Sequence, residues 1–263
     1  MSGINGLSAS YGSYASMRNY SHVSQSLSSG KKINRAADGA AELAILQKQD
    51  VQARGYQVGT ENLKTGKNAL NIADGAMSGV ADYLQRMREL AIKASNGTNS
   101  AEDKEYMQKE IDQLKQGIGE IASNTSYNEN KLLDGSASDK IIISDSEGTS
   151  LSFSTPNSAL SALGIEDFDV TGDFDISKID SALTKVGAGR ASMGAQSNMI
   201  DYAIGYNDNA AYNTVSAQSR TGDTEYGSYV SKMQKESLLQ TYRIMMQKHQ
   251  IEQHRQNTVG LFH

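Results

Sequence analysis

The hydrophobic positions of this chain recur every three or four residues over long stretches, which is the spacing of one apolar face on an α-helix. If residues 45–95 form a single helix, it is about 75 Å long, well above the usual helix of a globular protein. A second series of this kind follows over residues 107–121, and a third runs from Ile179 to Ile204. Within the first series, seven positions alternate steps of three and four, as in helices that pack along a seam: Ala73, Ala76, Val80, Tyr83, Met87, Leu90 and Ala94.

The boundaries of these helices are marked by residues that start or stop helices. The stretch 96–99 (Asn-Gly-Thr-Asn) is typical of a helix end. Ser100, with Asp103 three residues later, resembles a capping box, which predicts a new helix that ends near 123–128. A further break is expected at 220–223. Pro156 is the single proline of the chain, so long helices can form on both sides of it.

Residues 129–175 have a different pattern. Two short runs, 140–144 (Lys-Ile-Ile-Ile-Ser) and 150–154 (Ser-Leu-Ser-Phe-Ser), are of the β type, and residues 145–148 between them favour a turn. The sequence therefore predicts a β-hairpin, followed by a stretch rich in loops.

The two ends of the chain are amphipathic arms. The first carries Ser, Gly and Tyr, which lower helical propensity, yet its apolar residues keep the helical spacing, so we expect it to become helical when a partner covers them. The last arm, from residue 224, has a similar series, and arms of about 40 residues lack a large core of their own. Other copies of the chain are the natural partner. The apolar positions of the two arms include Ile4, Leu7, Tyr11, Tyr14, Val23, Leu27, Val230, Met233, Leu238, Tyr242, Met245, Ile251, Leu261 and Phe262.

These patterns predict a mainly α fold, a long antiparallel helical rod or coiled-coil bundle with a small β-hairpin region. Composition agrees with a thin core, since the chain has 38% hydrophobic residues, 4 Phe and no Trp. The net charge of -5 argues against binding nucleic acid. No apolar run is long enough to insert into a membrane. No secretory signal peptide is visible, so a soluble cytoplasmic protein is expected, or one exported by a route that reads another signal.

The sequence offers no catalytic site, no metal site and no cofactor motif. His249 and His254 lack the spacing of a zinc-binding helix. Asp167 opens a stretch similar to a calcium loop, but Lys178 occupies the position that needs a bidentate Glu. Without cysteine, disulfides and Cys-ligated metals are excluded. An enzyme is therefore not expected.

Several motifs in matching order resemble bacterial flagellin. Near the first arm these are Leu27-Ser-Ser-Gly30 and Lys32-Ile-Asn-Arg-Ala-Ala-Asp-Gly-Ala-Ala41. Gln85-Arg-Met-Arg-Glu-Leu-Ala91, then Ser95-Asn-Gly-Thr-Asn-Ser100, is similar to the family's first rod helix and its turn. Tyr127-Asn-Glu-Asn-Lys-Leu-Leu-Asp-Gly-Ser136, Ser192-Met-Gly-Ala195 and Asn257-Thr-Val-Gly-Leu-Phe262 continue the resemblance. The first 20 residues are richer in Gly, Ser and Tyr than the usual family opening, and the chain ends in His263 where a basic residue is common.

The resemblance implies a structural subunit that polymerises into the flagellar filament, the propeller of motility. It implies a filament-core domain (1–44 and 224–263), a rod domain (45–134 and 176–223) and a β-hairpin and loop connector (135–175). Only about 40 residues separate the two halves, too few for the variable outer domain of other members, so this is a short form. The product would be an extracellular filament protein, exported through the flagellar type III channel without a cleaved signal peptide.

The resemblance also implies partners: further flagellin copies, an export chaperone on the arm 224–263, and junction and cap proteins. By motif match, a host innate immune receptor would contact Arg86, Leu90 and Glu110. Two alternatives stay open at this point. One is a hook–filament junction protein with the same terminal architecture, and the second is a non-flagellar coiled-coil protein. An enzyme embedded in an outer domain is not expected, because the chain lacks the length for such a domain.

Overall fold

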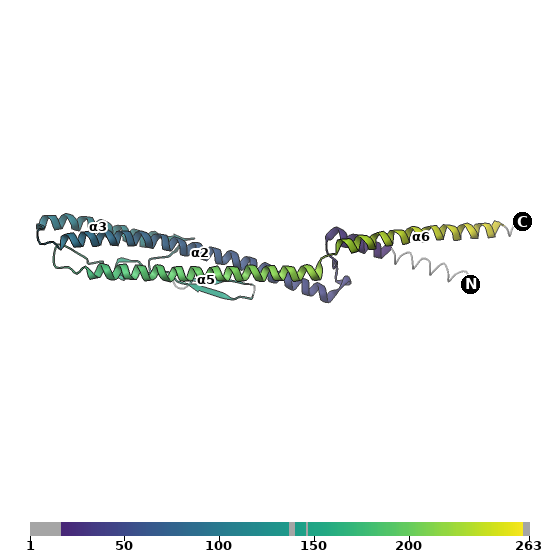
Figure 1. Cartoon of the computed structure of the whole chain (residues 1–263), viewed down its shortest axis with the longest axis horizontal. Helices are drawn as coiled ribbons and strands as arrows, with labels where there is room; N and C mark the ends of the chain where they lie inside the picture. The colour runs from purple at the N-terminus through teal and green to yellow at the C-terminus, as the bar shows by residue number, and fades with distance from the viewer. Residues whose placement is uncertain (1–16, 137–139, 146, 260–263) are drawn as a thin grey trace. The chain divides into compact units, whose positions relative to one another are not determined.

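The computed structural model describes residues 17–136, 140–145 and 147–259, and it is mainly helical (Figure 1). The predicted fold class, long helices with a small β-hairpin region, is confirmed. After a first helix at 17–29, the elements are η1 (Ala36–Asp38), α2 (Ala40–Ala94), α3 (Ala101–Asn124), β1 (Ser126–Tyr127), β2 (Asn130–Lys131), β3 (Lys140–Ile143), β4 (Ser150–Phe153), α4 (Leu160–Leu163), α5 (Ser177–Gly222) and α6 (Tyr226–Val259).

The chain divides into two compact units. The terminal unit joins Met1–Val51 with Asn213–His263, and the central unit is Gln52–Tyr212. Helix α2 has 55 residues and spans about 83 Å. The single helix considered over 45–95 is thus present, and it begins at Ala40 and ends at Ala94.

In the central unit, α2, α3 and α5 lie side by side (Figure 1). Their facing sides form one hydrophobic core, in which Leu84 and Ile118 are fully buried. Burial of each such side chain contributes about 1.5–3 kcal/mol. The seam of α2 keeps regular steps of four and three, through Ala73, Met77, Val80, Leu84, Met87, Ala91 and Ala94.

This seam differs from the predicted one at two positions. Met77 and Leu84 take the places expected for Ala76 and Tyr83, whereas Leu90, which was expected in the seam, is buried beside Ala91. Tyr83 is 37% exposed, and its ring lies against α3 at Gly117, where an added Cβ would be 2.7 Å from Tyr83 Cε2. A tyrosine at the edge of the seam keeps its hydroxyl near water while its ring still packs.

Helix α3 begins with the predicted capping box. The Ser100 side chain accepts from the Asp103 amide, and the Asp103 carboxylate accepts from the Ser100 amide at 3.0 Å. The Ser100 hydroxyl and then the Ser100 amide hold the pKa of Asp103 below its usual value, because both donors stabilise the charged form.

The predicted hairpin is present as the antiparallel pair β3–β4, with Lys140 opposite Phe153 and Ile143 opposite Ser150. In its turn, Asp145 Oδ1 accepts from the amides of Glu147 and Thr149, both at 2.9 Å. Ile142 and Phe153 are the buried residues of the two strands. Both pack against Gly66 of α2, where an added Cβ would lie 2.2 Å from Ile142 Cδ1.

The turn end of the hairpin is attached to two helices. From α2, the Cα of Gly59 lies so close that an added Cβ would be 1.8 Å from the Ser144 carbonyl oxygen, and Asn62 Nδ2 donates to the Ile143 carbonyl at 3.1 Å. From α5, the buried Asn207 donates through Nδ2 to the same Ser144 oxygen at 2.6 Å. The hairpin is therefore a packed layer of the central unit.

The segment after the hairpin also contributes to the core. Pro156 packs on α5 at Gly189, whose added Cβ would be 2.8 Å from Pro156 Cγ. The short helix α4 was not expected. Beyond it, Ile165, Phe168 and Val170 are buried in the same core as the long helices, so this stretch is more than a loop.

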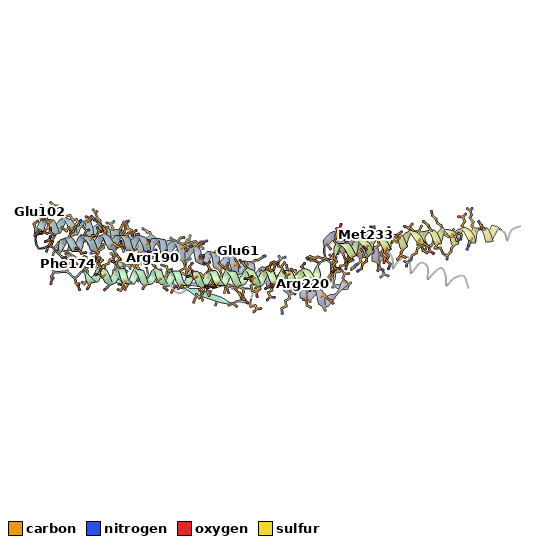
Figure 2. The ribbon with its side chains drawn as sticks, viewed as in Figure 1. Glu61, Glu102, Phe174, Arg190, Arg220 and Met233 are labelled. Atoms are coloured by element: carbon orange, nitrogen blue, oxygen red, sulfur yellow. The ribbon has the colours of Figure 1, made fainter. Side chains whose placement is uncertain are left out.

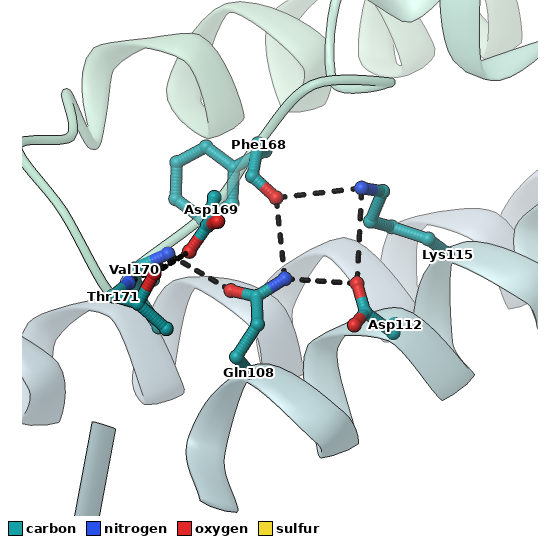
Figure 3. Close-up of polar contacts among 7 residues, drawn as sticks. All are labelled: Gln108, Asp112, Lys115, Phe168, Asp169, Val170 and Thr171. Atoms are coloured by element: carbon teal, nitrogen blue, oxygen red, sulfur yellow. Dashed lines mark hydrogen bonds and ion pairs between the residues drawn. The ribbon is translucent and has the colours of Figure 1, made fainter. Parts of the chain in front are cut away.

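Gln108 of α3 anchors the loop that carries Phe168 and Val170 (Figure 3). Its Oε1 accepts from the Val170 amide at 2.8 Å. Its Nε2 donates to Asp112 Oδ1 at 2.8 Å and to the Phe168 carbonyl at 3.5 Å. Lys115 Nζ reaches the same carbonyl at 3.4 Å. Within the loop, the hydroxyl and amide of Thr171 lower the pKa of Asp169.

Replacing Gln108 with Ala should lower the free energy of unfolding by about 1–3 kcal/mol, because the amide of buried Val170 then lacks an acceptor. Urea unfolding of the monomer measures the change. Gln116→Ala is the matched control: that amide donates to Glu120 on the exposed side of α3, so a change within about 0.5 kcal/mol is expected. Equal effects of the two substitutions would show that Gln108 does not hold the loop.

Candidate assembly surfaces

In the terminal unit, residues 30–32 and 222–224 meet through backbone hydrogen bonds. Lys31 and Asp223 form an antiparallel bridge. The Lys32 amide donates to the Gly222 carbonyl at 2.8 Å, and the Thr224 amide donates to the Gly30 carbonyl at 2.9 Å. Gly30 has a φ of 70°, which glycine adopts without strain. The first helix and α6 therefore depart from one paired segment, as the interpretation of adjoining arms requires.

Side chains strengthen this junction. Val23 and Ser26 of the first helix are buried, and the Thr224 hydroxyl donates to the Ser26 carbonyl at 3.2 Å. His22 Nε2 lies 3.2 Å from Asp38 Oδ1. The amides of Asn34 and Arg35 donate to the Asp38 carboxylate and are the main reason that its pKa lies below the usual value.

Helix α6 has two sides of different exposure. One side is half-buried and mixes apolar and polar residues: Tyr229, Val230, Met233, Glu236, Leu239, Gln240, Arg243 and Gln247. A different side carries Leu238, Tyr242 and Met245, with exposed fractions of 71%, 62% and 62%. These three follow one another at steps of four and three, so they form one stripe, which we term the outer stripe of α6.

The predicted arm residues fall into three groups. Ile4, Leu7, Tyr11, Tyr14, Leu261 and Phe262 lie outside the described residues. Val23 is buried, and Leu27, Val230 and Met233 are half-buried; Figure 2 labels Met233 on α6. Leu238, Tyr242, Met245 and Ile251 are exposed. The predicted series thus mixes residues that the single chain covers with residues that it leaves in water.

Three further apolar residues of α6 are exposed and were not predicted: Tyr226, Ile244 and Met246. The sequence did hold a signal for two of them, since Ile244 and Met246 flank Met245 in an apolar run of three. A search for a single stripe passes over such neighbours because they lie on other sides of the helix.

On the central unit, Arg86 pairs with Glu110 of α3, with Nη2 to Oε1 at 2.7 Å, and with Glu89 at 2.9 Å. The hydrogen bond to Glu110, then that to Glu89, raises the pKa of Arg86. Leu90 was expected on the same surface, but it is 3% exposed. This expectation is corrected, since Leu90 belongs to the core.

Ligand chemistry is sparse in the part of the chain that the structure describes. Within it, no group of three or more His, Cys, Asp and Glu residues could hold a metal ion. A search of the same residues finds no helix with the length and apolar character needed to cross a membrane. The stretch similar to a calcium loop uses its carboxylates locally: Asp169 accepts from Thr171, and Asp175 from Ser177.

Comparisons with known proteins agree with this geometry. Residues 6–138 match the model of the bacterial flagellin N-terminal helical region. A flagellin of Halalkalibacterium halodurans is 35% identical over 225 residues, which cover 82% of each chain. The crystal structure of Bacillus cereus flagellin matches with a TM-score of 0.50 and 31% identity, covering 56% of this chain and 88% of that one. A putative flagellar hook-associated protein from Vibrio parahaemolyticus, 14% identical with a TM-score of 0.55 over 71% of this chain and 98% of its own, shares the fold alone.

Proposed function

This chain belongs to the bacterial flagellin family and is a structural subunit of the flagellar filament, and we propose that its terminal arms are the surfaces through which copies polymerise. The relatives at 30–35% identity are flagellins, so the junction-protein alternative is not favoured. Flagellins are structural proteins rather than enzymes, which agrees with a chain whose notable surfaces are helix faces.

The observation that carries this proposal is the exposure of the outer stripe of α6. In water, Leu238, Tyr242 and Met245 leave most of their apolar surface uncovered. Burial of each such side chain is worth about 1.5–3 kcal/mol, while ordering the backbone costs about 1–2 kcal/mol per residue. In the single chain the outer stripe stays exposed and does not offset this cost, so we infer that contacts with neighbouring copies decide whether the arms are stably folded.

We expect amide hydrogens of α6 to exchange quickly in the monomer and slowly in the filament, because burial of the outer stripe suppresses local unfolding. Hydrogen exchange followed by mass spectrometry of both states measures this. Amides of α3, held in the core of the central unit, are the internal control and should be protected in both states. Equal protection of α6 in monomer and filament would contradict the proposal.

We further propose that residues 1–44 and 224–263 form the filament core, that 45–134 and 176–223 form a rod outside it, and that 135–175 connect the two halves of the rod. The hairpin and the segment after it are packed into the central unit, which supports a connector without an outer domain. Such a subunit would form a thin filament. Electron microscopy of assembled protein tests this, and density beyond the rod would contradict it.

The partner assignments are proposals of the same kind. An export chaperone would hold the arm 224–263 and cover the outer stripe before assembly. The chain would be exported through the flagellar channel without a cleaved signal peptide. Junction and cap proteins would contact the filament ends. Arg86 and Glu110, each with a side chain 43% exposed, would face an innate immune receptor, and Leu90 is not part of that surface. Copurification of the chaperone with α6 variants tests the first contact, and receptor activation by the Arg86→Ala variant tests the last. If a variant behaves as wild type, the substituted residue is not part of the proposed contact.

A further inference from the structure

The turn between α2 and α3 contains an asparagine that is followed by glycine. This dipeptide occurs twice in the chain, at Asn5-Gly6, which lies outside the described residues, and at Asn96-Gly97. Asn96 and Gly97 are both exposed. The backbone nitrogen of the residue after an asparagine lies close to the side-chain carbonyl carbon, so the two atoms are able to react within one molecule. Glycine permits their approach because it has no side chain in the way.

The reacting groups of this dipeptide are arranged by the turn. Asn96 Oδ1 accepts a hydrogen bond from the Thr98 amide at 3.2 Å, which keeps the side chain turned toward the backbone that follows it. The same N–H group would stabilise the negative charge that develops on Oδ1 when a nucleophile attacks Cγ. The Gly97 amide donates to no acceptor in the part of the chain that the structure describes. Its nitrogen is therefore free of the hydrogen bonds that protect helix amides.

The second asparagine of the same turn has the opposite arrangement. Asn99 Nδ2 donates to the Lys93 carbonyl at 2.6 Å, so its side chain is tied back to α2. The next amide, that of Ser100, donates to the Asp103 carboxylate at 3.0 Å as part of the capping box. Both reacting groups are thus engaged at Asn99, and both are available at Asn96.

We propose that Asn96 is a site of spontaneous deamidation in the folded chain. Solvent base removes the Gly97 amide proton, the nitrogen attacks Cγ of Asn96, and the bond from Cγ to Nδ2 breaks as ammonia leaves. Water then opens the cyclic imide. Attack at Cγ gives aspartate, whereas attack at the backbone carbonyl carbon gives isoaspartate, in which the chain continues through Cγ. The net reaction consumes one water and releases one ammonia, with no change of oxidation state.

Either product places a carboxylate at the C-terminal end of α2. Negative charge is unfavourable at a helix C-terminus, and Glu102, labelled in Figure 2, and Asp103 already occupy the first turn of α3. In isoaspartate the new carboxylate derives from the Asn96 backbone carbonyl, which accepts from the Asn99 amide at 3.1 Å in the unmodified chain. The modification therefore disturbs the turn that joins α2 to α3.

Mass spectrometry of the full-length monomer tests the proposal. The protein is kept at mildly alkaline pH, digested at intervals and analysed for the mass gain of NH2 exchanged for OH. Asn96 should convert at least about tenfold faster than Asn99, and Gly97→Ala should slow conversion at 96 by a similar factor. The fold tolerates this alanine, because an added Cβ meets no described atom within 4 Å and Gly97 has no positive φ, so the urea midpoint should not fall. Equal lifetimes of Asn96 and Asn99 in the wild type would overturn the proposal.

Ser100→Gly separates the geometry of the turn from the local sequence. It places glycine after Asn99 as well, and glycine is a tolerated replacement for a serine cap. In the folded variant, Asn96 should still convert at least about fivefold faster than Asn99, whereas in urea the two rates should agree within about twofold, because unfolding removes the difference in position. Equal rates in the folded variant would overturn the proposal, since sequence alone would then explain the reactivity of Asn96.

Discussion

Replacing Leu238 and Tyr242 together with serine should raise the monomer concentration needed for polymerisation by at least about 100-fold. Each loses about 1.5–3 kcal/mol of burial in the filament, and every 1.4 kcal/mol is a factor of ten in the equilibrium constant. In the monomer both side chains are mostly exposed, so the single chain loses little. Light scattering and sedimentation over a concentration series measure the threshold.

Gln250→Ser is the matched control for this pair. It makes a comparable change in helical propensity on another exposed part of α6, and its threshold should stay within about twofold of wild type. Circular dichroism of the monomers checks that helix content is preserved. If the double variant assembles at the wild-type concentration, the outer stripe of α6 is not a filament contact, and the proposed core needs another surface.

Replacing Gly59 with Ala should lower the free energy of unfolding of the monomer by about 3 kcal/mol or more. The new Cβ would lie 1.8 Å from the Ser144 carbonyl oxygen, so the turn end of the hairpin has to move away from α2. Overpacking of this kind costs about 1–3 kcal/mol. Losing the buried hydrogen bond from Asn207 to the same oxygen adds about 1–3 kcal/mol.

Gly75→Ala makes the same chemical change in the same helix, where an added Cβ meets no described atom within 4 Å. It should stabilise the monomer by about 0.5–1 kcal/mol, because alanine favours the helix over glycine. Urea unfolding compares the two variants. Two changes of the same sign and size would show that the hairpin does not depend on its close approach to Gly59.

Local sequence signals predicted the elements of this molecule well. The capping box at Ser100 and Asp103 and the hairpin over 140–154 appear where the pattern placed them. The break expected at 220–223 comes slightly later, because α5 continues to Gly222 and α6 begins at Tyr226. Each depends on side-chain chemistry within a few residues, such as a hydroxyl oxygen that accepts a hydrogen bond from a nearby backbone amide. Such contacts form in nearly the same way whatever the rest of the chain does.

The arm residues show what local signals could not predict, namely which apolar residues of a helix are buried. A series such as Val230, Met233, Leu238, Tyr242 and Met245 identifies an amphipathic helix, but a helix with apolar residues on several sides has more than one possible seam. In the structure, Met233 is half-buried, whereas Leu238 is 71% exposed, so the two do not belong to the same seam.

By itself, the sequence determined the helices, their caps, the hairpin and the membership in the flagellin family, because periodicity and short motifs are local properties of the chain. Only the tertiary structure decided that Leu84 rather than Tyr83 faces the core, that the hairpin docks at Gly59, and that Leu90 is buried. Steps of three and four are equally helical. The choice between them depends on residues far along the chain that fill or leave the space beside each position.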